Sequence, residues 1–337
     1  MDINAAPGRG ICGARGAAVA IGNFDGLHLG HMRLINALKR LAAPRGLPTL
    51  VCTFDRHPAN ALSGTDRVKM LADARKKAEI LSSAGVDALV IERFSHEFAS
   101  LAPEDFIKRK LIREYGARLI VAGKDFRFGI KASGTVETLR EIGRSFGLPV
   151  EEIPPYAVCV AGAGNAAGKI TVSSSYIRAL IRDGLTDRIP PLLGRLYSIR
   201  GFASRENKPD SHGRPTAVIS PDVRAAVPRP GVYITRTLAG GALYRGITAV
   251  EAAPVSAAGG AGSASDPAAA RPLRLNNYAI DFDNDLHGGE IEIFFYLRLR
   301  DIGRSGGETR GEARFESDIG AAKGYFDYVD VNQEGYN

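Results

Sequence analysis

Between Ala17 and Ile153, short runs of valine, isoleucine and leucine alternate with longer segments of helical periodicity. This alternation is the pattern of a parallel sheet whose strands are joined by crossover helices. The first part of the chain is therefore predicted to be a doubly wound α/β domain, in which ligands bind beyond the carboxyl ends of the strands. The predicted strands are Ala17–Ile21, Thr49–Thr53, Ala88–Ile91, Leu119–Val121 and Val150–Ile153.

The segments between these strands have the apolar spacing of helices that pack on a sheet. After Gly30, apolar side chains recur at helical spacing, at Leu34, Ile35, Leu38 and Leu41. Further helices are predicted at Asp73–Ser83, Pro103–Tyr115, Val136–Phe146 and Ser175–Arg182.

After Arg195 the chain is dominated by glycine, proline and short apolar stretches. The segment from about 252 to 270 is rich in alanine, glycine and serine, cannot bury a core, and is predicted to be a flexible insertion. With 337 residues the chain is expected to hold two domains, placed at 1–190 and 191–337. Strands of a small antiparallel β-barrel are predicted at Gly231–Thr235, Leu243–Val250, Tyr278–Phe282 and Glu290–Leu299.

The net charge of +7 comes from lysine and arginine scattered among acidic residues. This distribution suits phosphorylated small molecules at least as well as nucleic acid. Cys12, Cys52 and Cys159 are widely spaced and lack metal-ligand spacing, so they are expected to be reduced thiols of a cytosolic protein. The apolar run Ala17–Ile21 is too short for a signal peptide or a membrane span, and a cytoplasmic location is expected.

The first strand runs into a glycine-rich turn and then directly into a helix. Backbone N–H groups and the positive dipole end of such a helix start stabilise phosphate oxygens, and imidazoles can donate hydrogen bonds to charge that develops on a phosphoryl group. An ordinary Asp-Gly turn with surface histidines is the alternative, but the position between strand and helix favours phosphate binding. The turn carries Gly22, Asn23, Phe24, Gly26, His28, Gly30 and His31.

A second cluster opens a later helix. Serines at a helix N-terminus are most often caps, which explains one of them. Three serines followed by an arginine one turn later can also clamp a polyphosphate, because hydroxyls and a guanidinium can face the same oxygens. The residues concerned are Ser173, Ser174, Ser175 and Arg178.

The loop from Gly123 to Gly129 follows the strand Leu119–Val121 and alternates aromatic with charged residues. Aromatic residues just beyond a parallel strand are usually core residues, and that interpretation is about as good on composition alone. The alternation of Phe126 and Phe128 with charged neighbours such as Asp125 instead suits a planar, partly polar ligand such as a flavin ring.

Five segments resemble, in this order and at similar separations, those of bacterial bifunctional riboflavin kinase/FAD synthetases. They are GNFDGLHLGH, TFDRHP, GKDFRFG, SSSYIR and LLGRLYSIRG. The HxGH pattern alone is shared with a wider nucleotidyltransferase superfamily, but the set is specific; Arg56 stands where the family usually has proline. The resemblance implies a nucleotidyltransferase domain of the HxGH type that transfers AMP from ATP to flavin mononucleotide (FMN), giving FAD and pyrophosphate.

The resemblance also implies roles for the three clusters. Mg²⁺ would accompany ATP and bridge phosphate oxygens, and catalysis would consist of positioning and charge stabilisation without a protein nucleophile. ATP and FMN are the expected partners, with riboflavin as a further candidate, and neither nucleic acid nor a membrane is expected. Catalytic roles fall to His28, His31 and Arg178, ATP contacts to Gly22, Asn23, Phe24, Gly26, Gly30, Ser173, Ser174 and Ser175, and flavin contacts to Asp125, Phe126 and Phe128.

The second half resembles the riboflavin kinase barrel of this family, but residues that carry its chemistry differ. Thr216 matches a metal-binding threonine, whereas Val218 and Asn276 stand where the family has a metal-binding asparagine and a catalytic glutamate. Pro209–Asp210 replaces a Gly-Arg pair of the nucleotide loop. A carboxylate can accept the riboflavin hydroxyl proton and an amide at neutral pH cannot, so the kinase is expected to be impaired unless Glu251 supplies the carboxylate. The matching segments are Gly213–Val218, Gly231–Tyr233 and Asp281–Gly288.

Three other functions stay open. A fully bifunctional enzyme would make FMN and then FAD. Another HxGH nucleotidyltransferase would act on a different phosphorylated vitamin, against which the GKDFRFG loop and the barrel argue. A non-catalytic flavin-binding protein is the third, and the intact His28, His31 and Arg178 argue against it.

Overall fold

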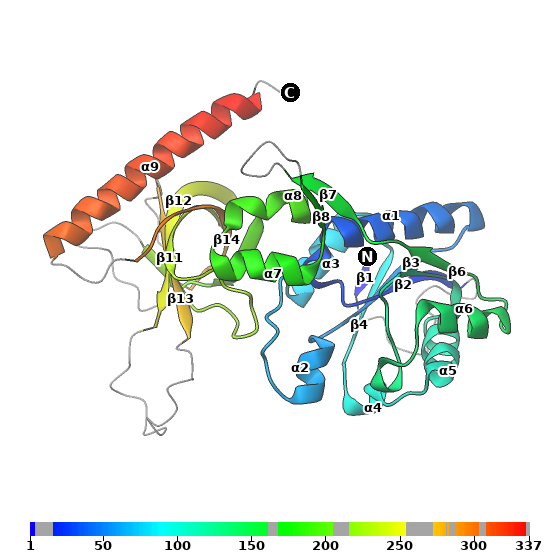
Figure 1. Cartoon of the computed structure of the whole chain (residues 1–337). Helices are drawn as coiled ribbons and strands as arrows, with labels where there is room; N and C mark the ends of the chain where they lie inside the picture. The colour runs from blue at the N-terminus through cyan, green and yellow to red at the C-terminus, as the bar shows by residue number, and fades with distance from the viewer. Residues whose placement is uncertain are drawn as a thin grey trace. The chain divides into compact units, whose positions relative to one another are not determined.

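The computed structural model describes residues 1–3, 16–160, 168–204, 216–253, 272–280, 282, 288–302 and 308–334. The chain divides into two compact units (Figure 1). The first comprises Met1–Tyr176 and Leu192–Gly194, and the second Ile177–Pro191 and Arg195–Asn337. Features that lie outside the described residues are Cys12, Pro209–Asp210, Gly213–Pro215, residues 281 and 283–287, and all of the predicted insertion after Ala253.

The first unit is built on a parallel sheet with the strand order β1-β4-β3-β2-β5-β6. This arrangement confirms the predicted doubly wound domain, to which the structure adds the short strand β1 and a small antiparallel pair, β7 and β8. The strands are β1 (Asp2–Ile3), β2 (Ala17–Ile21), β3 (Thr49–Phe54), β4 (Ala88–Glu92), β5 (Ala117–Gly123), β6 (Val150–Ile153), β7 (Ala157–Val160) and β8 (Gly168–Thr171).

Helices cover both faces of the parallel sheet, as Figure 1 shows for α1 and α6. Ala18 and Ala20 of β2 belong to one buried cluster, together with side chains of α1 (Leu29–Ala42) and α3 (Ala74–Ser83). Successive side chains of a strand point to opposite faces, so Val19 joins a second cluster on the other side. That cluster contains side chains of η4 (Phe106–Glu114) and α6 (Val136–Arg144).

Helix ends differ from the predictions where a side chain or a change of helix type sets the boundary. The helix predicted from Asp73 begins at Ala74, because the Asp73 carboxylate caps it by accepting a hydrogen bond from the Lys76 backbone N–H at 2.6 Å. The helix predicted over Pro103–Tyr115 is divided into α5 and the π-helix η4. The remaining short elements are α2 (Pro58–Ser63), α4 (His96–Ala99), α5 (Pro103–Asp105), α7 (Ser174–Asp183), α8 (Pro190–Leu193), and the 3₁₀ turns η2 (Asp25–Leu27), η3 (Ala43–Arg45), η5 (Ile130–Ala132) and η6 (Thr186–Arg188).

The second unit holds an antiparallel sheet with the order β10-β13-β12-β11-β14-β9. The sheet curls until its edge strands meet, where the Ser204 backbone N–H donates to the Val218 carbonyl at 2.8 Å. This confirms the predicted antiparallel barrel, although one predicted strand, Tyr278–Phe282, is wrong in position. The strands are β9 (Tyr197–Phe202), β10 (Thr216–Ile219), β11 (Gly231–Ala239), β12 (Ala242–Ala252), β13 (Leu273–Ala279) and β14 (Glu290–Arg300).

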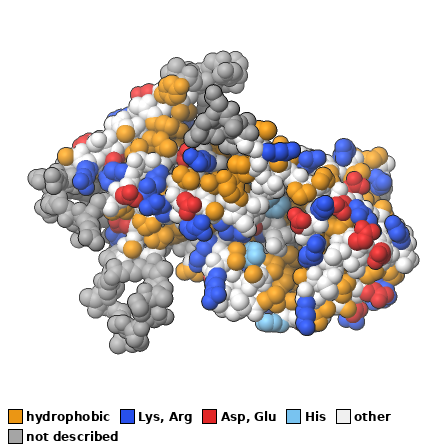
Figure 2. Space-filling model, viewed as in Figure 1, with side chains coloured by type: hydrophobic (Ala, Val, Ile, Leu, Met, Phe, Trp, Pro, Cys, Tyr) orange, Lys and Arg blue, Asp and Glu red, His pale blue; other side chains and the backbone are white. Residues whose placement is uncertain are grey.

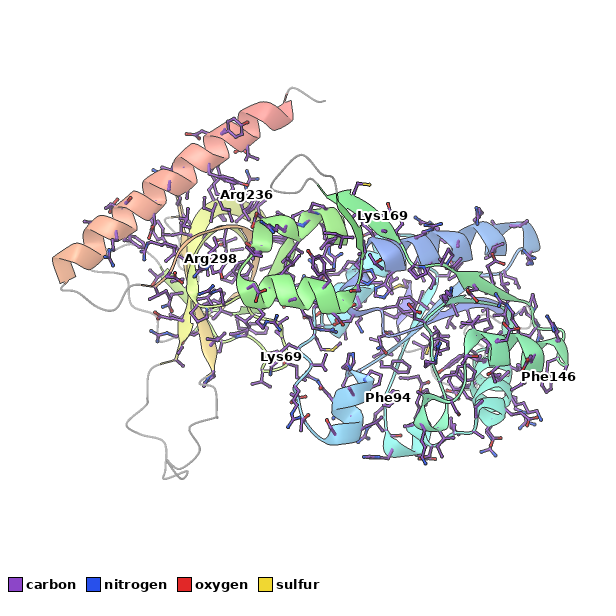
Figure 3. The ribbon with its side chains drawn as sticks, in the orientation of Figure 1. Lys69, Phe94, Phe146, Lys169, Arg236 and Arg298 are labelled. Atoms are coloured by element: carbon purple, nitrogen blue, oxygen red, sulfur yellow. The ribbon has the colours of Figure 1, made fainter. Side chains whose placement is uncertain are left out.

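A long C-terminal helix, α9 (Glu308–Glu334), packs on the barrel and has no counterpart among the predicted elements. Its Ile319, Ala322 and Phe326 join an apolar cluster with strand residues such as Ile234. Arg236, labelled in Figure 3, lies 4.9 Å from the Phe326 ring centroid and pairs with an aspartate of the helix. Apolar burial and ion pairs therefore hold α9 on the sheet.

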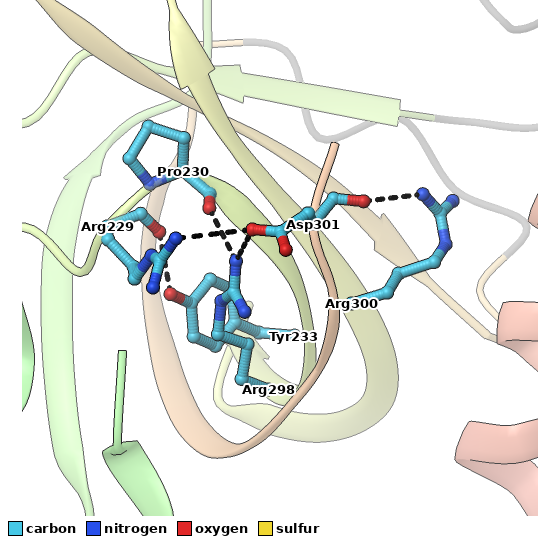
Figure 4. Close-up of polar contacts among 6 residues, drawn as sticks. All are labelled: Arg229, Pro230, Tyr233, Arg298, Arg300 and Asp301. Atoms are coloured by element: carbon cyan, nitrogen blue, oxygen red, sulfur yellow. Dashed lines mark hydrogen bonds and ion pairs between the residues drawn. The ribbon is translucent and has the colours of Figure 1, made fainter. Parts of the chain in front are cut away.

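The ends of β11 and β14 are joined by a polar cluster (Figure 4). Arg298 donates to the Pro230 carbonyl at 3.0 Å and pairs with Asp301, which also accepts from Arg229 at 3.3 Å. The Tyr233 hydroxyl donates to the Arg229 carbonyl at 2.6 Å. This cluster fixes the strand ends. Elsewhere on the visible surface, lysine and arginine side chains are interspersed with acidic ones (Figure 2).

Candidate functional site

A cavity of about 960 Å³ opens at the carboxyl ends of the parallel strands in the first unit. Gly22 after β2, Phe54 at the end of β3, Gly123 at the end of β5 and Ile153 at the end of β6 all line it. The sheet order reverses direction at β2, which has β3 on one side and β5 on the other. The cavity therefore lies at the topological switch point, where open α/β sheets bind ligands.

The cavity brings most of the candidate residues together. Gly26 and Ser175 are not among its lining residues, and Arg178 and Thr216 belong to the second unit. The candidate residues on its wall are Gly22, Asn23, Phe24, His28, Gly30, His31, Asp125, Phe126, Phe128, Ser173 and Ser174.

The loop between β2 and α1 has an unusual backbone. Phe24 and Leu27 adopt positive φ angles of 41° and 43°, and Gly26 one of 77°. A Cβ atom on Gly26 would lie 2.9 Å from Leu71 Cβ, so this glycine is needed for both its backbone angle and its packing. A non-glycine residue in this region is strained, and such strain clusters at binding sites.

Asp25 holds this loop in place and does not face the cavity. Its side chain is 1% exposed, and Oδ1 accepts hydrogen bonds from the backbone N–H groups of Leu71 at 2.9 Å and Ala72 at 3.4 Å. Its carbonyl oxygen accepts a hydrogen bond from Ser174 Oγ at 2.9 Å. The Asp-Gly pair is thus a structural anchor that joins the loop to two distant segments.

His28 and His31 form a stacked pair at the start of α1. Their ring centroids lie 3.7 Å apart with an interplanar angle of 12°. His28 is the N-cap of the helix, because its Nδ1 accepts the backbone N–H of His31 at 3.3 Å. A Cβ atom on Gly30 would lie 3.2 Å from the His28 ring, so a side chain there would crowd the imidazole that caps the helix.

His31 is held in its neutral form. Burial, the neighbouring His28 and the charge of Lys77, in that order, hold the pKa of His31 well below its usual 6.5. Its Nδ1 is buried and makes no hydrogen bond among the described residues. A buried polar nitrogen without a partner is rare in folded proteins. Because Nδ1 is buried, His31 lines the cavity through the other atoms of its ring.

The serines of the second cluster have different roles: one caps a helix and another binds the loop between β2 and α1. Ser173 Oγ accepts the Tyr176 backbone N–H at 3.2 Å, which is the expected cap. Ser174 is bonded to the carbonyl of Asp25, and Ser175 is exposed. Helix α7 begins in the first unit and continues into the second, where Arg178 lies.

Aromatic side chains form one wall of the cavity. Phe126 and Phe128 stack at 5.5 Å, but Phe128 is only 6% exposed and packs on Phe106 in the core, as the simpler interpretation of this loop expected. Sequence reasoning missed two other wall residues, Phe94 (labelled in Figure 3) and Phe98, which contact Phe54 edge to face. Their only signal was an aromatic residue just beyond β4.

In the second unit, the positions singled out for kinase chemistry lie side by side on one face of the barrel. Val218 of β10 is the cross-strand partner of Asn276 of β13, and Thr216 is two residues along β10. The Asn276 amide donates to Glu251 of β12, whose carboxylate also accepts two hydrogen bonds from Arg274, at 2.6 and 2.9 Å. The carboxylate nearest to Asn276 is therefore held by a guanidinium.

Comparisons with known proteins match the two halves of the chain to two different family models. A family model described as FAD synthetase matches residues 13–162, and one described as riboflavin kinase matches residues 193–324. Bifunctional riboflavin kinase/FMN adenylyltransferases are similar over most of their length. The protein from Listeria monocytogenes is 30% identical over 312 residues, 91% of this chain and 92% of its own. That from Buchnera aphidicola of Schizaphis graminum is 29% identical over 316 residues, 93% and 95% of the two chains.

A solved structure is similar over most of the chain. The crystal structure of a protein described as a macrolide-efflux protein from Streptococcus pneumoniae superposes with a TM-score of 0.76 at 26% identity, over 93% of this chain and 95% of that one. In the described parts of this chain, we find no helix of the length and apolar character that a membrane span requires.

Proposed function

Since the chain belongs to the family of bifunctional riboflavin kinase/FMN adenylyltransferases, we propose that it transfers AMP from ATP to FMN and releases pyrophosphate. The observation that carries this proposal is the cavity of the first unit. It joins two stacked imidazoles at a helix start, two serines and an aromatic wall within one space. Phosphate-binding and planar-ligand features meet there, as a reaction between ATP and a flavin phosphate requires.

In the proposed reaction, an FMN phosphate oxygen attacks the α-phosphorus of ATP while the bond to the pyrophosphate oxygen breaks. Neutral His31 donates a hydrogen bond to the phosphoryl oxygens as negative charge builds on them. His28 Nδ1 accepts a backbone N–H, so a neutral His28 carries its proton on Nε2 and can donate from that atom. Backbone N–H groups at the start of α1 stabilise the phosphates.

ATP enters this proposal as its magnesium complex. Magnesium binds few protein ligands when substrate phosphates supply oxygens, and its role is to neutralise phosphate charge. Asp125 places a carboxylate among the cavity-lining residues and could bind the complex directly or through water. Among the residues that the structure describes, no three His, Cys, Asp or Glu side chains converge on a metal position.

The test is direct. The purified protein is incubated with Mg-ATP and FMN, and the flavins are separated by chromatography while pyrophosphate is followed by a coupled assay. FAD and pyrophosphate should form in equal amounts. The hypothesis is falsified if folded protein at saturating FMN produces neither.

We propose further that the barrel unit phosphorylates riboflavin more slowly than the first unit adenylylates FMN. Val218 offers no oxygen to a metal shell, and the Asn276 amide cannot take a proton from the riboflavin hydroxyl. Glu251 accepts a hydrogen bond from the Asn276 amide, but the same oxygen, Oε1, also accepts two from Arg274, so this carboxylate is paired with a guanidinium. These contacts support an impaired kinase.

A further inference from the structure

Lys77 is a buried lysine beneath the loop between β2 and α1 (residues 22–28), which is called the nucleotide loop of the first unit from here on. Its side chain is 2% exposed on the inner face of α3, where Ala78 and Leu81 are also buried. Lysine is almost never buried without partners, because burial strips the ammonium of its hydration. A buried Lys77 therefore needs hydrogen-bond acceptors within the protein to replace the lost water.

The Lys77 ammonium has three acceptors, as many as it has N–H donors. They are the carbonyl of Asn23 at 3.1 Å, Thr53 Oγ1 at 3.1 Å and the carbonyl of Phe54 at 3.4 Å. Thr53 Oγ1 in turn donates to the Asn23 carbonyl at 2.8 Å. One cation thus joins the first residues of the nucleotide loop to the end of β3.

Lys77 is not among the residues that line the cavity, whereas Asn23, Phe24 and Phe54 are. It can therefore influence a ligand by contact only through these residues. The loop that it holds includes Phe24, with a strained φ of 41°, and leads into His28 and His31. A strained loop keeps its shape only if its surroundings determine it.

We propose that Lys77 is a positioning residue for the adenylyl transfer proposed above: by fixing the Asn23 carbonyl from beneath, it sets the height of the nucleotide loop and the orientation of the imidazoles toward the α-phosphate. Its positive charge has a second effect, since it contributes to the lowered pKa of His31 after burial and His28. The titratable groups that act on His31 are His28 from α1 and Lys77 from α3. Those that act on Lys77 are Asp25, Asp55 and Asp73.

The test compares three variants. Lys77→Met removes the charge and the donors while keeping the side-chain length, Thr53→Val removes the other donor to Asn23 without changing charge, and Lys76→Met removes a positive charge next along the same helix. Loss of positioning costs on the order of 10²-fold in rate. We expect kcat to fall by about that factor in Lys77→Met, to fall less in Thr53→Val, and to stay unchanged in Lys76→Met, with the KM for FMN unchanged throughout.

The pH dependence separates a positioning role from simple support of the fold. Removing a positive charge lets His31 bind a proton more easily, so its pKa should rise in Lys77→Met but not in Thr53→Val or Lys76→Met. The acid limb of kcat should move to higher pH in the first variant alone. Histidine NMR titration gives the same shift without any turnover.

Two results would overturn the proposal. One is a Lys77→Met protein with the kcat and pH profile of Lys76→Met; the other, decisive if Lys77→Met does not fold, is a Thr53→Val protein with unchanged kcat. Failure of the proposed function is distinguishable, because the unmodified chain would then form no FAD while the NMR titration would still report the effect of Lys77 on His31.

Discussion

The two imidazoles at the start of α1 differ in their hydrogen bonds. His28 is fixed by accepting the backbone N–H of His31, and it is part of the helix start. His31 lines the cavity, and its buried Nδ1 has no hydrogen bond among the described residues. We therefore expect substitution of His31 to affect turnover more than stability, and substitution of His28 to affect the helix start as well.

The first prediction concerns turnover. His31→Ala should lower kcat for FAD formation by about 10²–10³, as loss of a preorganised donor to a developing oxyanion does, with a much smaller effect on the free energy of unfolding. His96→Ala is the matched control, because His96 also lines the cavity but is exposed. Equal rates in the two variants would remove His31 from the mechanism.

A second prediction follows from the lowered pKa of His31, whose main cause is burial. The unfolded chain binds a proton at this position near the usual value of 6.5, whereas the folded chain resists it. The free energy of unfolding is therefore unaffected by this histidine above pH 6.5 and decreases as the pH falls below that value, by up to about 1.4 kcal/mol per pH unit. Urea unfolding on either side should show a smaller acid loss in His31→Asn than in the unmodified chain; identical losses would contradict it.

At the scale of elements, the loop between β2 and α1 depends on Gly26. Gly26→Ala should destabilise the protein by about 1–2 kcal/mol for its left-handed backbone, and by roughly 1–3 kcal/mol more for the overlap with Leu71. Gly46 has a similar φ of 59° but nothing within 4 Å of a new Cβ, so Gly46→Ala isolates the backbone cost. Chemical denaturation of both variants gives the difference, and equal losses would mean that Leu71 moves aside freely.

Elements were predictable where burial followed a simple period. Strands β2 to β5 are mainly apolar runs between amphipathic helices, and periodicity places them. Strand β6, with two glutamates between Val150 and Ile153, was placed by its position after a helix. Strand β13 was misplaced because it carries two asparagines, and Asn277 is 1% exposed inside the barrel, hydrogen-bonded to Thr237 and Thr248. Helix α9 was missed because Gly320 and Gly324 each lower helix propensity by about 1 kcal/mol, and packing on the barrel compensates.

The candidate site was predictable only as far as local motifs reach. The turn from Gly22 to His31 and the loop after β5 were predicted because each follows a strand and carries residue types that bind phosphate or a planar ring. Residues of both segments line the cavity. Lys77 could not be found, since a lysine on an amphipathic helix is usually solvated, and only the fold brings it under Asn23. The anchoring role of Asp25 has the same cause, because its partners lie more than forty positions along the chain.

At the scale of the whole molecule, we expect the two units to differ in activity. The cavity of the first unit contains its imidazoles, serines and aromatic wall. In the barrel, Val218 and Asn276, the two residues on which the proposed impairment of the kinase rests, are cross-strand partners. Because they are neighbours, the effects of changing both need not add.

The full chain should therefore make FAD from FMN much faster than it makes FMN from riboflavin, both with Mg-ATP. Loss of a general base alone typically costs about 10²–10⁴ in rate. Chromatography of the products from each substrate measures the ratio. Val218→Asn combined with Asn276→Glu should raise the riboflavin rate and leave the FMN rate unchanged, because both positions lie in the barrel unit. Rapid phosphorylation by the unmodified chain would contradict this, and if Glu251→Gln then abolished it, the carboxylate beside Asn276 would be the base despite its pairing with Arg274.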